Sequence, residues 1–265
     1  MNSLSYKPRY KVDSKNLDDL QNCGSWDMEP VDRSLDVDKV KSHLESIDNS
    51  TKRDIAEKII SNTKYIPFSE FKNKYLDLIK QLPEKYNLAF LTDAKIGSEH
   101  WLVVMLWPYL KTRCAKVINS PLDLVNLDNN YPILVVDDCM YSGCNMCGTV
   151  DCLQYDYINY TKKELTNSFI IMTAYRGVDS TNQLCKDFGT VKVITGEIIT
   201  PPKLKGYDYM YDNFGCESCC VLPLYFDHKI ANNFGSYPEI YTKIIKNQPS
   251  RYQIERLESI LEKNI

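Results

Sequence analysis

Short apolar runs alternate with stretches of helical periodicity over residues 85–200, and this alternation constrains the fold more than any other feature of the 265-residue chain. Successive βα units have this pattern, and nearly continuous apolar strands indicate a parallel sheet with helices on both faces. In such sheets, ligands bind at the carboxyl ends of the strands, near the point where the strand order reverses. We therefore predict an α/β fold with a parallel, Rossmann-like sheet of about five strands. The predicted strands span residues 87–92, 115–119, 133–137, 169–173 and 191–195, and the predicted helices between them span 98–110, 143–157 and 181–188.

The rest of the chain divides into segments before and after this core. Residues 1–33 are mostly polar and interrupted by Pro8, Gly24 and Pro30, so we expect an extended arm there. Helical periodicity predicts three helices that begin near Asp36, Thr51 and Phe68. The expected organisation is an arm and helical lead-in over 1–84, a core over 85–200, and a hood-like segment over 201–265 that ends in a helix from about residue 249.

The charge of the chain argues against some classes of partner. A formal net charge of −3 provides no broad cationic field, so we expect neither nucleic acid nor an anionic membrane as a partner. The sequence has no apolar run of membrane-spanning length, and its first twenty residues lack the apolar centre of a signal peptide. We expect a cytoplasmic protein.

Ten cysteines would indicate disulfides in a small secreted chain, but without an export signal we expect reduced thiols. Cys144 and Cys147 have a CxxC spacing, as do Cys216 and Cys219, and four thiolates of this kind could hold a structural zinc ion. Ordinary thiols are the preferred interpretation, because the first pair falls where a phosphate-binding turn is expected. We predict no dedicated metal cluster.

The segment over residues 133–145 is the most informative for function. Four apolar residues predict a buried strand, and Asp137 and Asp138 follow at its carboxyl end, where the pleat directs their side chains to different sides. A turn with Ser142, Gly143 and Asn145 then leads into a helix. Two carboxylates can accept hydrogen bonds from neighbouring ribose hydroxyls, while turn amides and a helix N-terminus can hold a phosphate. This segment therefore predicts a site for a phosphorylated sugar.

The same segment resembles the phosphoribosyl-pyrophosphate (PRPP) signature of the type I phosphoribosyltransferases. Asp137 and Asp138 match the acidic pair, Ser142 and Gly143 match the hydroxyl and the glycine, and Asn145 stands where the family has a second hydroxyl. Tyr141 stands where the hypoxanthine-guanine branch has a catalytic aspartate, which argues against purine salvage. The PRPP-binding residues that the resemblance implies are Asp137, Asp138, Cys139, Met140, Tyr141, Ser142, Gly143, Cys144 and Asn145.

The end of the first predicted strand supplies a candidate pyrophosphate loop. Proteins of this family place that loop between the first strand and the following helix, and use backbone amides and a cation there. Lys95 would neutralise pyrophosphate charge, so the resemblance implies Asp137, Asp138 and Lys95 as catalytic residues. A plain strand-to-helix turn with a solvated lysine is the alternative. The candidate loop comprises Asp93, Ala94, Lys95, Ile96, Gly97 and Ser98.

Two further stretches are candidates for binding the base. Arg176 follows the fourth predicted strand, and an arginine there is equally consistent with a surface charge. An aromatic ring with neighbouring donors, as in the segment 226–229, suits nucleobase recognition, although Phe226 alone would more simply be a core residue and His228 a turn residue. The candidate base-binding residues are Arg176, Phe226, Asp227, His228 and Lys229.

The resemblance implies transfer of the phosphoribosyl group of PRPP to a nucleobase or similar nitrogen acceptor, with release of pyrophosphate, Mg²⁺ delivered with PRPP, and a homodimer as the candidate assembly. The connection over residues 120–131 is short and apolar, where active relatives have a long closing loop. A PRPP- or nucleotide-binding regulator without turnover is therefore the runner-up. A structural or interaction protein that only retains the fold is the third hypothesis.

Overall fold

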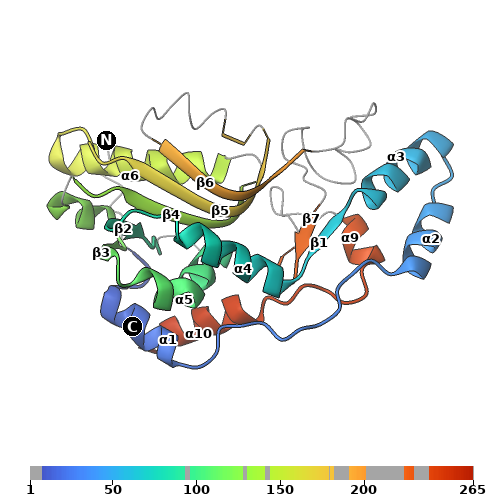
Figure 1. Cartoon of the computed structure of the whole chain (residues 1–265), viewed down its shortest axis with the longest axis horizontal. Coiled ribbons are helices and arrows are strands. Elements are labelled where there is room, and N and C mark those ends of the chain that lie inside the picture. The colour runs from blue at the N-terminus through green and yellow to red at the C-terminus, as the bar shows by residue number, and fades with distance from the viewer. Residues whose placement is uncertain are drawn as a thin grey trace.

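The computed structural model is an α/β protein in which helices lie on both faces of one large sheet (Figure 1). The structure describes residues 8–92, 96–127, 130–140, 144–178, 180–181, 191–200, 224–229 and 239–264.

The large sheet has five strands, and every neighbouring pair is parallel. The predicted fold class is thereby confirmed, and the observed strands overlap the predicted ones in all five places. The strands are β2 (Tyr86–Ala89), β3 (Cys114–Ile118), β4 (Ile133–Met140), β5 (Phe169–Gly177) and β6 (Val191–Ile199).

The strand order across this sheet is β3-β2-β4-β5-β6. The chain passes from β2 outward to the edge strand β3, and then returns to place β4 on the other side of β2. This order is the flavodoxin-like arrangement, whose ligand crevice lies at the switch point, between the carboxyl ends of the strands that correspond to β2 and β4.

Each face of the sheet is buried by its own helices, because alternate residues of a strand point to opposite sides. Leu134 and Val136 of β4 belong to the core shared with α4 (Phe68–Ile79) and α5 (Ser98–Leu110). Ile133 and Val135 belong to the core shared with α6 (Cys144–Thr161). Helix α5 has the bounds that its apolar run predicts, and it is apolar on all sides because α1 (Ser14–Asn22) and α10 (Tyr252–Asn264) cover its outer surface (Figure 1).

The N-terminal residues are not the extended arm that we expected. Helix α1 forms there because Asp13 and Asn16 make a reciprocal capping box at its start. Leu17 and Leu20 of this helix, and Trp26 beyond it, are buried in the core. The sequence of this segment is mostly polar because α1 has only one narrow apolar stripe, formed by Leu17 and Leu20. That stripe packs into the core.

A smaller assembly of chain segments lies beyond one end of the large sheet (Figure 1). Its centre is a two-stranded parallel sheet of β1 (Lys64–Ile66) and β7 (Leu224–Phe226), which joins distant parts of the sequence. Ile55, Ile59 and Tyr225 share its core with Tyr241. The helices of this assembly are α2 (Val37–Glu45), α3 (Ser50–Ser61) and α9 (Glu239–Ile244).

Several predictions from the sequence fall outside the described residues. These are most of the helix over 181–188, the segment 201–223 of the hood, and the side chains of Cys144, Cys216 and Cys219.

Five cysteines among the described residues are free thiols: Cys23, Cys114, Cys139, Cys147 and Cys152. No helix within the described ranges combines the length and the apolar character that a membrane span requires. The connection between β3 and β4 contains a 3-10 helix, η1 (Pro121–Asn126), in which the side chain of Leu124 is buried.

Candidate functional site

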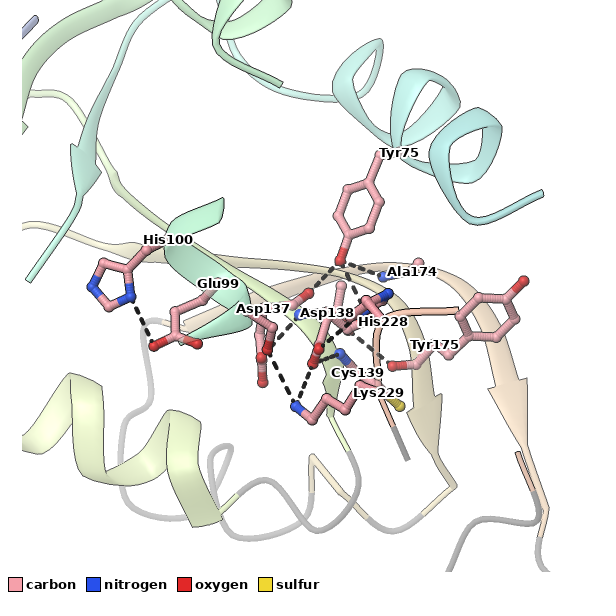
Figure 2. A network of polar contacts seen from close by, with 12 residues as sticks. Tyr75, Glu99, His100, Asp137, Asp138, Cys139, Ala174, Tyr175, His228 and Lys229 are labelled. Atoms are coloured by element: carbon pink, nitrogen blue, oxygen red, sulfur yellow. Dashed lines mark hydrogen bonds and ion pairs between the residues drawn. The ribbon is translucent and has the colours of Figure 1, made fainter. Parts of the chain in front are cut away.

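The acidic pair lies at the carboxyl end of β4, next to the switch point between β2 and β4. Both aspartates are buried inside the protein: Asp137 is 8% exposed and Asp138 is 0% exposed. Figure 2 shows them surrounded by side chains from α4, α5, β5 and the segment that follows β7. The structure thus places the predicted residues at the edge of the sheet where α/β proteins bind ligands.

Tyr75 of α4 fixes the backbone at this point. Its hydroxyl donates to the backbone carbonyl oxygen of Asp137 and accepts from the amide of Ala174 on β5, with an N···O distance of 3.1 Å. The hydroxyl therefore bridges β4 and β5 where their direct pairing is interrupted. Beyond this interruption, the alternation of β4 side chains between the two faces of the sheet shifts by one residue. Cys139 therefore faces the same core as Val136. The sequence did not indicate this role of Tyr75, which lies within the helix expected to begin near Phe68.

Asp138 is held by groups from the segment after β7. Its Oδ1 accepts from Lys229 Nζ at 2.9 Å and from the amide of Cys139 at 2.7 Å. Its Oδ2 lies 3.1 Å from His228 Nε2. Figure 2 shows the Lys229 ammonium pointing toward the carboxyl groups of both Asp137 and Asp138. A buried carboxylate with three donors, one of which is a cation, is well suited to carry a negative charge.

The two neighbouring carboxyls have opposite pKa shifts. Burial opposes ionisation of Asp138, but the charge of Lys229 and the hydrogen bond with His228 outweigh it and hold the pKa of Asp138 far below its usual range. Burial raises the pKa of Asp137 well above its usual range, and the negative charge of Asp138 raises it further. The two adjacent carboxyls therefore differ in protonation: Asp138 is ionised, whereas Asp137 favours its protonated form.

His228 is enclosed by aromatic rings. Its ring stacks on Phe226 with a centroid distance of 5.3 Å and contacts Phe71 at 4.8 Å and Trp101 at 5.0 Å. Its Nδ1 has no hydrogen-bond partner within the described part of the chain. The residue was predicted as a base-binding candidate, and the structure places it beneath the acidic pair, with its polar contact directed to Asp138.

Phe226 and Asp227, also candidates for base binding, lie in the protein interior. Phe226 is fully buried in the core beneath the sheet. Asp227 accepts from Arg33 Nη1 at 3.0 Å, from the Tyr65 hydroxyl at 2.6 Å and from the first amide of α4, that of Phe68, at 2.6 Å. These contacts tie the N-terminal segment, β1 and the start of α4 together, so the packing of Asp227 is structural.

Part of the predicted pyrophosphate loop is described, at the start of α5. Ile96 is buried, and the Gly97 amide donates to Nδ1 of His100 at 3.1 Å. The Ser98 hydroxyl lies 3.4 Å from Lys229 Nζ. The start of α5 therefore lies beside Lys229 and the acidic pair, whereas Asp93, Ala94 and Lys95 lie outside the described residues.

The remaining candidates are distributed around the end of the sheet. Cys139 and Met140 are buried in opposite cores, and the backbone of Cys144 and Asn145 opens α6. Tyr141, Ser142 and Gly143 lie outside the described residues, as do the side chains of Cys144 and Asn145. Arg176 is the residue before the last in β5, and its guanidinium donates to the nearby carbonyl oxygens of Gly177 at 3.2 Å and Val178 at 3.3 Å.

The N-terminal segment contacts the same end of the sheet, which the sequence did not indicate. The Arg9 amide donates to the Thr92 carbonyl at 2.7 Å, and the Tyr10 amide donates to the Thr92 hydroxyl at 3.2 Å. The Val12 amide donates to Asn119, just beyond β3, at 3.0 Å. These hydrogen bonds fix the chain that leaves β2 and β3 at the edge where the site lies.

The fold and the position of the acidic pair define a doubly wound α/β protein with two carboxyls at its switch point. Among solved structures, the chain is similar to the xanthine-guanine-hypoxanthine phosphoribosyltransferase of Helicobacter pylori, with a TM-score of 0.31 and 14% identity over 52% of this chain and 84% of that one. It is also similar to the AQ2163 protein of Aquifex aeolicus, with a TM-score of 0.30 and 15% identity over 67% of this chain and 91% of that one. Similarity at this level carries no argument about ligand or activity. The chain matches no protein-family model and no curated protein sequence.

Proposed function

We propose that the chain binds PRPP at the carboxyl ends of β2 and β4 and transfers its phosphoribosyl group to a nucleobase or similar nitrogen acceptor, with release of pyrophosphate. In this reaction the bond between the anomeric carbon and the pyrophosphate oxygen breaks, and a bond between that carbon and the acceptor nitrogen forms. The phosphoribosyltransferase signature over residues 133–145 motivates the proposal.

The observation that carries this proposal is the position of Asp137 and Asp138. They end a central strand of the sheet, and α6 begins a few residues later at Cys144. The first strand of the same sheet, β2, pairs with β4 and leads to the start of α5. Two helices thus begin near the switch point where the acidic pair lies, and helix N-termini and carboxyls are groups that can bind a sugar phosphate.

Each group has a proposed role in the reaction. The acidic pair would orient the ribose, and residues 141–145 would hold the 5′-phosphate. Lys95 and the loop 93–98 would stabilise the departing pyrophosphate, because positive charge and amide donors stabilise charge that develops on a leaving group. Lys229 adds a second cation beside the acidic pair. Mg²⁺ would enter with PRPP, since it prefers phosphate oxygens and water to a cage of protein ligands.

The proposal is tested by incubating the protein with PRPP, Mg²⁺ and each common nucleobase and measuring release of pyrophosphate. Release that depends on one base, and that falls at least about tenfold in Asp137→Asn, is the expected result. The matched control is Asp77→Asn, which alters a carboxylate on the exposed side of α4 that is 74% exposed and ion-paired with Lys80. Absence of release with every base would contradict transfer.

The second candidate function is a regulator that binds PRPP or a nucleotide without turnover. The observation that favours it is the connection between β3 and β4, where η1 packs Leu124 into the core and spans only Pro121–Asn126. A connection packed in this way differs from the long loop that closes over a reacting ligand. Calorimetry that detects PRPP binding in a protein that releases no pyrophosphate would favour the regulator, whereas turnover would exclude it.

A further inference from the structure

Strands β4, β5 and β6 share one irregularity near their carboxyl ends. In both neighbouring pairs, the regular pairing omits one row of residues, formed by Asp138, Ala174 and Gly196, and it resumes at the next residue. The register before this row is the same as the register after it, so the three strands deviate together. We call the row of Asp138, Ala174 and Gly196 the crease of the sheet.

The crease changes the face of the sheet on which the following side chains lie. In a regular strand, neighbouring residues lie on opposite faces. In β5, however, Ala174 and Tyr175 both belong to the core on the α4 side. In β6, a Cβ atom at Gly196 would lie 3.0 Å from the side chain of Lys74 on α4, and the next residue, Glu197, lies 2.8 Å from Lys74 Nζ. The crease therefore turns Tyr175 and Glu197 toward α4, where regular alternation would not place them.

Hydroxyl groups hold the backbone at the crease. The Tyr75 hydroxyl donates to the Asp137 carbonyl oxygen and accepts from the Ala174 amide at 3.1 Å, so it lies between β4 and β5 (Figure 2). Thr173 and Thr195 come just before the crease in β5 and β6. Their hydroxyls donate to the backbone carbonyl oxygens two residues ahead, at 2.9 and 3.3 Å. Three hydroxyls therefore bond to the backbone where the regular pairing is interrupted.

Gly196 allows β6 to follow the same path as β5. A Cβ atom at this position would lie 2.8 Å from the backbone carbonyl oxygen of Ala174, which is closer than unbonded atoms approach each other. Because that oxygen belongs to the neighbouring strand, a larger residue would push the two strands apart. Tyr75, Thr173 and Ala174 are all fully buried, so the crease is part of the core.

The side chains that the crease turns toward α4 contact the smaller assembly or its neighbours. The Tyr175 hydroxyl donates to Glu70 of α4 at 2.8 Å. Glu197 accepts from Lys64 Nζ of β1 at 3.2 Å, and Lys64 Nζ lies 3.2 Å from Glu70 as well. Strand β1 pairs with β7, which leads into the turn that ends at Lys229. These contacts therefore fasten the smaller assembly to the ends of β5 and β6.

We propose that Tyr75 is a positioning residue, whose hydroxyl holds the crease and thereby sets the smaller assembly, with Lys229, against the carboxyl ends of β4, β5 and β6. The hydroxyl is buried and bonded to two backbone groups, so it acts on a ligand through the crease and not by contact. The effect on a ligand rests on the proposed function, whereas the crease and its link to the smaller assembly do not.

Amide hydrogen exchange tests the crease itself. In Tyr75→Phe, the Ala174 amide should exchange at least about tenfold faster relative to the amides of Ile170 and Ile171, earlier in β5, because it has lost its acceptor. Equal acceleration along all of β5 would overturn the crease, since it would report only a lower global stability. If Tyr75→Phe does not fold, Thr173→Val takes its place, and the same contrast is expected because it removes another hydroxyl that holds the crease.

A double-variant cycle tests the link to the smaller assembly. Tyr175→Phe removes the hydroxyl that reaches Glu70 and should lower Tm by roughly 3 °C. In the Tyr75→Phe background, the same substitution should lower Tm by less than about 1 °C, because a relaxed crease no longer directs Tyr175 to Glu70. Equal losses in the two backgrounds would overturn the link.

Tyr86→Phe is the matched control. The Tyr86 hydroxyl is buried and donates to the Leu110 carbonyl oxygen at 2.8 Å, but Tyr86 begins β2 and so lies at the opposite end of the parallel sheet from the crease. Its substitution should also lower Tm by roughly 3 °C, and this loss should add to that of Tyr75→Phe. Coupling of Tyr86 to Tyr75 as strong as that of Tyr175 would count against the proposal.

Calorimetric titration with PRPP and Mg²⁺, at a temperature where every variant is folded, tests the positioning role. Tyr75→Phe should weaken PRPP binding at least about tenfold, whereas Tyr86→Phe should change it less than about twofold although it also lowers Tm. Equal PRPP affinities of the two folded variants would overturn the positioning role. If the natural protein does not bind PRPP, the proposed function and the effect of Tyr75 on a ligand both fail, and the exchange experiment and the thermal cycle still decide the crease.

Discussion

The hydroxyl of Tyr75 donates a hydrogen bond to the backbone carbonyl oxygen of Asp137, so a side chain from α4 holds the strand that carries the candidate site. The same hydroxyl accepts from the amide of Ala174, and it replaces direct pairing of β4 with β5 at this position. The geometry of the acidic pair therefore depends on a residue from outside the sheet.

Tyr75→Phe tests this dependence. The substitution removes one oxygen and leaves a buried amide and a buried carbonyl without a partner, which should lower the free energy of unfolding by about 2–4 kcal/mol. Urea denaturation measures the change. Tyr252→Phe, at a side chain that is 63% exposed, should change stability by less than about 0.5 kcal/mol. Equal effects of the two substitutions would contradict the bridging role of Tyr75.

Asp137→Asn should change the pH dependence of stability. The pKa of Asp137 is raised in the folded state by burial and by Asp138, so the carboxyl stabilises the fold most below its unfolded pKa. As pH rises from the unfolded pKa toward the raised folded pKa, the natural protein must lose this contribution, whereas the amide does not titrate. The advantage of Asp137→Asn in free energy of unfolding should therefore grow with pH over this window and then level off. Urea denaturation from pH 4 to 9 measures it, and parallel curves for the two proteins would refute the shift.

Arg33→Met should destabilise the junction between the N-terminal segment and the smaller assembly. The ion pair of Arg33 and Asp227 is buried, with side chains that are 7% and 3% exposed, and removing one partner leaves a charge in the interior. The expected loss is about 3 kcal/mol in the free energy of unfolding. Lys80→Met breaks the exposed pair with Asp77 and should cost less than about 1 kcal/mol. A loss for Arg33→Met that is no larger than this control would show that the buried pair contributes little.

Asn119→Ala should loosen the N-terminal segment. The Asn119 side chain accepts from the Val12 amide and donates to the Phe90 carbonyl and the Thr92 hydroxyl. Its removal should cost about 2 kcal/mol and raise amide hydrogen exchange at Val12 and neighbouring residues above that of the sheet. Unchanged exchange in this segment would mean that packing of Leu17 and Trp26 alone retains it.

The sequence predicted those parts of the fold that depend on local pattern. The five strands and α5 were found because burial on both faces of a parallel sheet leaves continuous apolar runs. Helix α1 was missed, because a short helix with one narrow apolar stripe resembles a polar arm when its partner helix is unknown.

The residues of the candidate site were likewise predictable only where they depend on local sequence pattern. Asp137 and Asp138 were found from their place after an apolar strand. The contact of Lys229 with Asp138 was not found, because it depends on how β7 pairs with β1, and no local pattern encodes a pairing between segments so far apart. Phe226 and Asp227 were proposed as base-binding residues because an aromatic ring stands beside polar groups in the segment 226–229, with a core position for Phe226 as the alternative, and the structure shows both side chains buried.

The pairing of β1 with β7 also has a consequence for how the protein is made. A ribosome releases residues 64–66 early and residues 224–226 late, and the two strands must meet before Lys229 reaches the end of β4. Closing so long a stretch of chain is slow compared with forming adjacent βα units. The large sheet is therefore expected to assemble first, with Asp138 lacking its counter-charge until the last quarter of the polypeptide has been synthesised.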